Sequence, residues 1–221
     1  MSNNRTDARA TAENCLTAAQ MRDLEQSVIQ SGQVSGLALM ERAGCGVVAK
    51  IAELFPGDNG GQALVLCGPG NNGGDGYVIA RLLDDAGWQV TVAGLGQADR
   101  MPPDARTNRK LWEKSRPVAD LSSGIPEPKP DLIVDAIFGI GLSRSIEPPL
   151  SDRFAEATVL ATKTGALRLA VDLPSGLETD HGDIMGTVLA ADETVTFHQL
   201  KVAHLKRPDL CGNLTIVDIG L

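Results

Sequence analysis

The chain has 221 residues, 43% of them apolar, a share that is sufficient for a buried core of ordinary size. Its net charge of −8 and its few aromatic residues (2 Trp, 1 Tyr and 4 Phe) argue against the basic surface and the stacking platform of a nucleic-acid-binding protein. No segment approaches the ~20 apolar residues of a membrane-spanning helix, and the polar N-terminal segment lacks the apolar stretch of a secretory signal. The four cysteines have neither the spacing of a zinc site nor the density of a disulfide framework and indicate reduced thiols, so we expect a cytoplasmic protein with no nucleic-acid and no membrane partner.

The N-terminal part of the chain predicts a tail followed by two helices. Residues 1–14 are polar and predict a flexible tail, whereas residues 15–221 predict a single domain. Thr17 and Gln20 have the spacing of a capping box, which predicts a helix that begins there and ends near residue 31. A second helix is expected over about residues 36–53, and the two glycines in its interior favour close packing against a sheet.

Strands and helices alternate through the rest of the chain. Apolar runs predict strands at residues 63–67, 89–95, 132–137, 167–171, 193–197 and 214–218. The segments between them predict helices at residues 73–86, 102–115 and 149–164. This alternation is typical of an α/β protein whose parallel sheet is covered by helices on both faces. In such sheets ligands bind at the carboxyl ends of the strands.

The segment after the first of these strands is rich in glycine. Gly68, Gly70 and Gly73 fit the pattern G-x-G-x-x-G between a strand and a helix, where backbone N–H groups can face an anion. A dinucleotide-dependent dehydrogenase also needs an acidic residue at the end of the second strand, and residues 92–96 contain none. No Gly-Lys-Ser/Thr sequence follows a glycine-rich loop, which excludes a P-loop nucleotidase. A tight turn that binds no ligand is the alternative.

Acidic residues end two of the inner strands. Asp135 and Asp172 each follow an apolar run, and Ser175 comes three residues after Asp172. With Asn72, the residues Asp135 and Ser175 provide oxygen atoms that suit a weakly held hard cation and argue against zinc or copper. Capping of a following turn is the alternative role for Asp135. Lys201 follows another strand and is placed to contact a phosphate or a carboxylate.

Five segments carry a resemblance to a known family. They read, in chain order, LMERAG (39–44), GPGNNGGDGYVIAR (68–81), VDAIFG (134–139), VDLPSG (171–176) and TFHQLK (196–201). With these segments the chain resembles the NAD(P)H-hydrate epimerase family, the YjeF N-terminal domain, from about Thr17 to Leu221. The resemblance implies a three-layer α/β/α Rossmann-like sandwich with a mostly parallel central sheet, commonly assembled as a homodimer.

The resemblance further implies an isomerase of nicotinamide nucleotide repair. Its substrate would be NADHX or NADPHX, a cofactor damaged by hydration at C6 of the nicotinamide ring, and it would interconvert the R and S epimers. A dehydratase then repairs the S epimer. Many bacterial relatives carry that activity on a second domain, whereas here we expect a stand-alone epimerase that works with a separate NAD(P)H-hydrate dehydratase. Inverting C6 needs cleavage of the C–O bond, a planar iminium-like cation and return of water on the other face.

By motif position, the resemblance assigns residues to the substrate, to a metal ion and to catalysis. The substrate-binding residues would be Asn71, Asn72, Gly73, Gly74, Asp75, Gly139, Ile140, Gly141, Leu142, Ser143, Arg144, Ser145 and Asp172. One potassium ion per subunit would be held by Asn72, Asp135 and Ser175. Asp172, beside the ring, would act as the acid to the leaving hydroxyl and then as the anion beside the cation, with Asp135 and Lys201 as further acid–base candidates. A non-catalytic nucleotide- or protein-binding module of the same fold and an NAD(P)-dependent oxidoreductase are the alternatives.

Overall fold

The centre of the molecule is a sheet of seven strands in the described part of the chain. The computed structural model describes residues 15–57, 60–126 and 129–221, so the predicted tail of residues 1–14 lies outside it. The strands are β1 (Gln62–Cys67), β2 (Gln89–Gly94), β3 (Ala119–Asp120), β4 (Leu132–Ala136), β5 (Leu167–Val171), β6 (Glu193–Phe197) and β7 (Asn213–Val217). Their order is β3-β2-β1-β4-β5-β6-β7, and every neighbouring pair is parallel. The predicted parallel sheet is confirmed.

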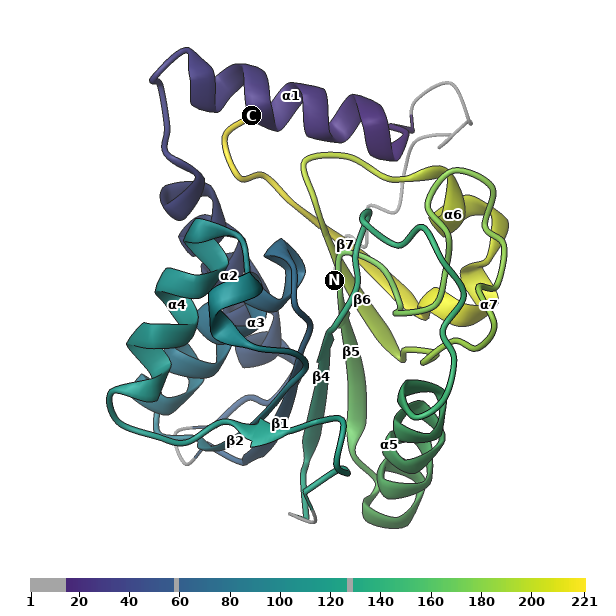
Figure 1. The fold of residues 1–221 in the computed structure, drawn as a ribbon. Coiled ribbons are helices and arrows are strands. Elements are labelled where there is room, and N and C mark those ends of the chain that lie inside the picture. The colour runs from purple at the N-terminus through teal and green to yellow at the C-terminus, as the bar shows by residue number, and fades with distance from the viewer. Residues whose placement is uncertain (1–14, 58–59, 127–128) are drawn as a thin grey trace, which may run out of the picture.

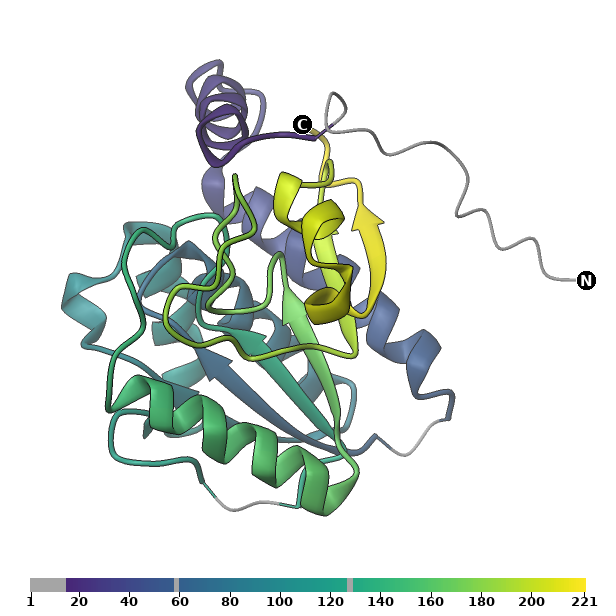
Figure 2. The same ribbon diagram turned by 90° about the vertical axis from the view of Figure 1, so that its right-hand side faces the viewer.

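Helices cover both faces of this sheet. They are α1 (Ala18–Gln30), α2 (Gly36–Leu54), α3 (Asn71–Asp85), α4 (Pro103–Glu113), α5 (Leu150–Thr164), α6 (Val202–Lys206) and α7 (Pro208–Cys211), with a turn of 3₁₀ helix, η2 (Ala98–Arg100). Figure 1 shows α2, α3 and α4 on one face and α5, α6 and α7 on the other, which Figure 2 turns toward the viewer. The three-layer sandwich is therefore confirmed. None of the helices within the described ranges has both the length and the apolar character to cross a membrane.

The element bounds differ from the prediction in places that have physical causes. Helix α3 begins at Asn71 rather than Gly73, with Gly70 as an extended N-cap, so most of the predicted glycine-rich loop is the first turn of a helix. Strand β3 and helices α6 and α7 are not predicted, because a strand of two residues and helices of four or five residues are too short to show a hydrophobic period. The capping box is confirmed: Gln20 N donates to Thr17 Oγ1, and Thr17 N donates to Gln20 Oε1.

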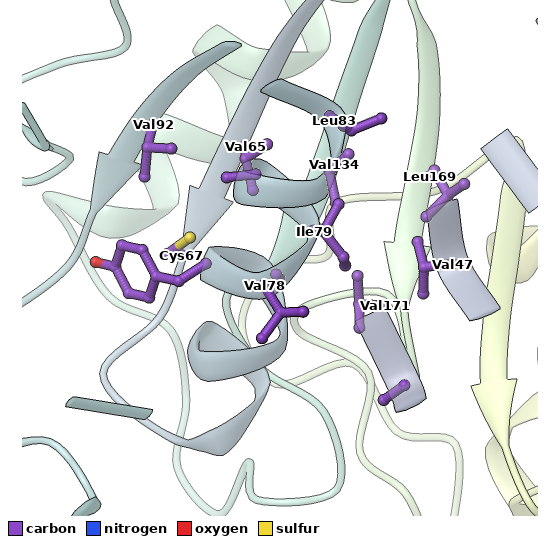
Figure 3. Close-up of a cluster of buried hydrophobic side chains, with 14 of the residues drawn as sticks. Val47, Val65, Cys67, Val78, Ile79, Leu83, Val92, Val134, Leu169 and Val171 are labelled. Carbon is purple, nitrogen blue, oxygen red and sulfur yellow. The ribbon is translucent and has the colours of Figure 1, made fainter. Parts of the chain in front are cut away.

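The two faces of the sheet carry separate hydrophobic clusters. Along β1, Val65 and Cys67 belong to the cluster beneath α2 and α3, whereas Leu64 and Leu66 belong to the cluster beneath α5. Figure 3 shows the first cluster, where β1 and the neighbouring strands meet residues of α3 such as Val78. These four side chains are at most 1% exposed, so this part of β1 is buried on both faces, as expected in a parallel sheet with helices on each side.

Two glycines allow α2 to approach its neighbours closely. A Cβ atom on Gly44 would lie 2.4 Å from Cγ1 of Val78 in α3, and one on Gly46 would lie 2.3 Å from Cγ1 of Val217 in β7. Packed protein interiors have no room for contacts this short, so a side chain at either position would push α2 away from the core. The predicted reason for the interior glycines, close packing, is confirmed.

Helix α1 lies across the carboxyl ends of the strands rather than against a face of the sheet (Figures 1 and 2). At its N-terminal end, Ala18 N donates to Asp180 Oδ1 at 2.7 Å. Further along, Arg22 Nη2 donates to Ile140 O, in the loop after β4, at 2.8 Å. These contacts hold one side of α1 over the end of the sheet at which ligands bind in parallel α/β proteins.

Candidate active site

A cavity of about 400 Å³ opens at the carboxyl ends of β1 and β4, next to α1. Strands β1 and β4 are neighbours in the sheet. From β1 the sheet continues to β2 in one direction, and from β4 it continues to β5 in the opposite direction, so the strand order reverses between β1 and β4. Such a reversal is where open α/β sheets form ligand-binding crevices. The predicted site residues that line the cavity are Asn71, Asn72, Asp75, Gly139, Ile140, Gly141, Asp172 and Lys201. The structure therefore brings together residues from the start of α3 and from the segments after β4, β5 and β6.

The other predicted substrate-binding residues are not among the lining residues of this cavity in the described chain. A Cβ atom on Gly73 would lie 1.9 Å from Gly68 O, and one on Gly74 would lie 2.6 Å from Met40 Sδ, so both glycines are needed for close packing. Leu142 is buried in the hydrophobic cluster beneath α5. The exposed positions are Ser143, Arg144 and Ser145. A contact between these residues and a substrate stays a prediction.

Asp172 is held as an anion by three donors. Its Oδ1 lies 2.8 Å from Lys201 Nζ and accepts a hydrogen bond from Thr196 Oγ1 at 2.9 Å. Its Oδ2 accepts a longer bond from Ile140 N at 3.3 Å. Burial by itself raises the pKa of Asp172, but the charge and hydrogen bond of Lys201, with the other donors, lower that pKa below its usual value. The carboxylate therefore stays ionised at neutral pH.

The backbone at Asp172 is constrained as well. Its φ of 68° lies in the left-handed region that residues with a side chain seldom adopt. His204 Nε2 lies 2.8 Å from Asp172 O, and His204 Nδ1 lies 3.0 Å from Lys201 N. Since an amide N–H can only donate, Nδ1 must accept and the proton must be on Nε2. One neutral imidazole thus connects the backbones of both members of the ion pair.

We expect His204 to stay neutral far below the pH at which an ordinary histidine becomes charged. Burial lowers its pKa from 6.5 to about 4, although the charge of Asp172 acts in the opposite direction. The unfolded chain binds a proton at this residue near pH 6.5, so the stability of the fold falls as the pH drops from 6.5 toward 4, by on the order of 3 kcal/mol. NMR of the ring nitrogens measures the tautomer directly. A positively charged ring at about pH 6 would contradict the assignment.

Asp135 and Ser175, two of the three predicted metal ligands, are bonded to each other. Ser175 Oγ donates to Asp135 Oδ1 at 2.6 Å, and Ser175 N donates to Asp135 Oδ2 at 2.8 Å. Ile137 N also donates to Asp135 Oδ1, at 3.1 Å, so the alternative role of Asp135 as a turn cap is present too. Asn72 lies near the loop after β4, with its Oδ1 3.1 Å from the position of a Cβ atom on Gly139. Its Nδ2 is buried and has no hydrogen-bond partner among the described residues, which leaves this amide available to a ligand.

Two charged residues that reach the cavity from α1 are not predicted from the sequence. Arg22 and Glu25 both line it. Burial and the negative charge of Asp172 raise the pKa of Glu25 to about 7, against the opposing positive charges of Lys201 and Arg22. The polar positions of a surface helix look alike in sequence, so only the placement of α1 over the strand ends identifies these two residues.

Asp75 is a third carboxyl group at the cavity. Burial raises its pKa well above the usual value, and the negative charges of Asp172 and Glu25 add to that effect. The cavity thus contains an ionised carboxylate, Asp172, and two carboxyl groups that retain their protons to higher pH, Glu25 and Asp75. In the three described ranges, no group of three or more His, Cys, Asp or Glu residues is arranged to hold a metal ion.

Comparison with known proteins assigns the family. Residues 36–203 match the family model described as "YjeF-related protein N-terminus". The chain belongs to the YjeF N-terminal family. A curated relative in Rhodobacter capsulatus, named NAD(P)H-hydrate epimerase, is 46% identical over 86% of this chain and 90% of its own. Another with the same name, in Roseobacter litoralis, is 43% identical over 93% of this chain and 98% of its own.

Two further comparisons concern a longer relative and a solved structure. A relative in Hyperthermus butylicus, named "Bifunctional NAD(P)H-hydrate repair enzyme Nnr", is 37% identical over 85% of this chain and 35% of its own length. The crystal structure of yeast ynu0 matches with a TM-score of 0.71 at 23% identity, covering 91% of this chain and 86% of the yeast chain. At that identity the yeast structure supports the fold alone.

Proposed function

We propose that this member of the YjeF N-terminal family is an NAD(P)H-hydrate epimerase, which interconverts the R and S epimers of NADHX or NADPHX. Relatives that are 43–46% identical carry that name. Within the structure, the observation that carries the proposal is the buried ion pair of Asp172 and Lys201 at a cavity that also contains carboxyl groups with raised pKa values. A fixed negative charge beside available protons is what the removal and return of a hydroxyl group on a cationic ring requires.

Asp172 suits one of the two tasks expected of it. Departure of the C6 hydroxyl leaves positive charge on C6 and N1 of the ring, and a fixed carboxylate beside the ring lowers the free energy of that state. Lys201 and Thr196 hold the carboxylate in place before the reaction begins. Because the same contacts keep Asp172 ionised, it is poorly suited to deliver a proton to the leaving hydroxyl. A different group has to act as the acid.

The pyrophosphate of the nucleotide is expected at the N-terminal end of α3. The N-cap, Gly70, supplies no side-chain acceptor, and the first hydrogen bond of the helix runs from Gly74 N to Gly70 O. The amide groups of residues 71–73 therefore have no partner within the helix, and together with the helix dipole they favour an anion. Arg22 lines the cavity and Arg144 does not, so Arg22 is the surface arginine that we expect near the phosphates.

We also propose that Asn72, Asp135 and Ser175 hold a potassium ion. They offer one carboxylate, one hydroxyl and one amide, and oxygen donors with so little charge suit a monovalent rather than a divalent cation. The unpartnered Nδ2 of Asn72 supports the fit. Rotation of the side-chain amide by half a turn exchanges its nitrogen and oxygen, and would place an oxygen donor at this buried position. When bound, the ion supplies a positive charge that orders these side chains beside the cavity.

Replacing potassium by tetramethylammonium at equal ionic strength is expected to lower the midpoint of thermal unfolding, because an ion that binds only the folded chain stabilises it. At 100 times its dissociation constant the ion contributes about 2.7 kcal/mol. In Asp135→Asn the difference between the two salts should disappear, whatever the stability of the variant itself. The control, Asp99→Asn, removes an equal charge from an exposed position and should keep the difference. Equal midpoints for the wild type in both salts would contradict the proposed ion.

The proposed function is tested with the R epimer of NADPHX as the substrate. The purified protein is expected to convert it to the equilibrium mixture of R and S much faster than spontaneous exchange does, and chromatography separates the two epimers. An oxidoreductase would instead form the reduced nicotinamide ring, with its characteristic absorbance, from NAD(P)⁺ and an alcohol. A non-catalytic binding module would bind the nucleotide and leave the ratio of epimers at the spontaneous value.

Two partners complete the proposal. The relative that is named a bifunctional repair enzyme supports a functional link to an NAD(P)H-hydrate dehydratase, which would consume the S epimer. We further propose that the protein forms a homodimer, and light scattering of the purified protein measures its mass in solution.

A further inference from the structure

Inversion at C6 requires proton transfer on both faces of the nicotinamide ring, because the hydroxyl leaves from one face and water returns to the other. Asp172 is ionised and bonded to three donors, so it supplies the proton on neither face. Two other carboxyl groups line the same cavity, Glu25 on α1 and Asp75 on α3. They are the candidates for the two proton transfers.

Glu25 and Asp75 reach the cavity from different walls. Helix α1 lies across the carboxyl ends of the strands, whereas α3 packs on a face of the sheet and begins just after β1 (Figure 1). A flat ring bound between α1 and the first turns of α3 would have one of these two carboxyl groups on each side. Both carboxyl groups are close enough to Asp172 for its charge to act on them. All three therefore surround one small volume.

On the basis of the epimerase function proposed above, we propose that Glu25 and Asp75 are the acid–base pair that inverts C6. Asp75 donates its proton to the C6 hydroxyl while the C–O bond breaks, the lone pair of N1 forms the C=N bond, and the hydroxyl leaves as water. A water molecule on the α1 side then forms the new C–O bond, and the C=N electron pair returns to N1. The excess proton of that water passes to Glu25. One proton has then moved from Asp75 to Glu25, and the reverse reaction or exchange with solvent returns it.

The charges around the two groups support this division of roles. Burial and the negative charges of Asp172 and Glu25 raise the pKa of Asp75 well above its usual value, which favours its protonated form. For Glu25, burial and Asp172 raise the pKa and the positive charges of Lys201 and Arg22 lower it, which leaves it at about 7. At neutral pH a large share of the molecules therefore has an ionised Glu25, and the proposed reaction starts from this state with Asp75 protonated.

The test uses the whole protein with both epimers of NADPHX. For the wild type, kcat/KM is expected to rise with pH through about 7 as Glu25 ionises. Glu25→Gln keeps the size of the side chain but accepts no proton, so kcat should fall about 100-fold or more, KM should stay within about threefold, and the rise with pH should be lost. The matched control is Asp23→Asn, which removes a charge from an exposed position on the same helix and should keep the rate and the pH profile.

The possible outcomes separate this acid–base pair from the function on which it rests. A wild-type protein that does not exceed spontaneous epimerisation removes the proposed function itself. With an active wild type, the pair is overturned if either Glu25→Gln or Asp75→Asn keeps kcat within about threefold, or if Glu25→Gln raises KM alone or keeps the rise with pH. Should Glu25→Gln not fold, Glu25→Asp replaces it. That variant retains a carboxyl group and should show the rise with pH at a reduced rate, and absence of the rise overturns the role of Glu25.

Discussion

Asp172→Asn is expected to lower kcat/KM for epimerisation by a factor on the order of 100 or more. Asparagine has the same size, can still accept the hydrogen bond of Thr196, and adopts a φ of 68° more readily than most residues. The substitution therefore removes little besides the negative charge beside the developing cation. Chromatography of the NADPHX epimers, after subtraction of spontaneous exchange, measures the effect.

The same variant should also lose stability, because Lys201 is completely buried and would lose the carboxylate that is its ion-pair partner. Removing one partner of a buried pair typically costs about 3–5 kcal/mol. The double variant Asp172→Asn/Lys201→Met removes both charges and is expected to recover most of the stability without recovering the rate. If the rate returned together with the stability, the single variant would have failed through misfolding, and the anionic role would belong to another group.

Gly68→Ala is expected to lower the free energy of unfolding by at least about 3 kcal/mol or to prevent folding. A Cβ atom at this position would lie 1.8 Å from Ile137 O and 2.9 Å from Ile137 Cα. These are backbone atoms, which cannot swing aside as the tip of a long side chain can, so the ends of β1 and β4 would have to separate. Unfolding in urea measures the loss.

Gly70→Ala, two residues further along, is the matched control. A Cβ atom there meets nothing within 4 Å, and the φ of −104° is open to any residue. Its free energy of unfolding should stay within about 1 kcal/mol of the wild type. Equal stability of the two variants would contradict the close approach of β1 and β4 at the cavity.

Much of the fold could be predicted because caps and apolar runs are local signals. Strands β5 and β6 have the predicted bounds, residues 167–171 and 193–197. The start of α3 could not be predicted, because asparagine and glycine are poor helix formers. In the structure the helix begins at Asn71, and Gly73 in its first turn packs closely against Gly68 O. This contact exists only in the folded turn and has no signal in the sequence.

The candidate site divides in the same way. Asp135 and Asp172 could be found because a charge at the end of an apolar strand opposes strand propensity. Glu25 could not, because its place at the cavity depends on how α1 folds across strands that are distant in sequence. The partner of Lys201 could not be assigned either, since its position after a strand suited a phosphate as well as the carboxylate of Asp172 that it contacts.

The small buried surface of α1 has a consequence for turnover. Of its side chains Ala18 and Met21 are buried, whereas α3 buries residues along most of its length. A segment with so few buried apolar groups opens locally at a fraction of the free energy of global unfolding, so the amide hydrogens of α1 should exchange with solvent much faster than those of α3. Because α1 lines the cavity and carries Glu25, the proposed proton acceptor, each opening is expected to expose a bound nucleotide to bulk water and to move that acceptor away from it. We therefore expect product release and the next chemical step to depend on the same local opening of α1.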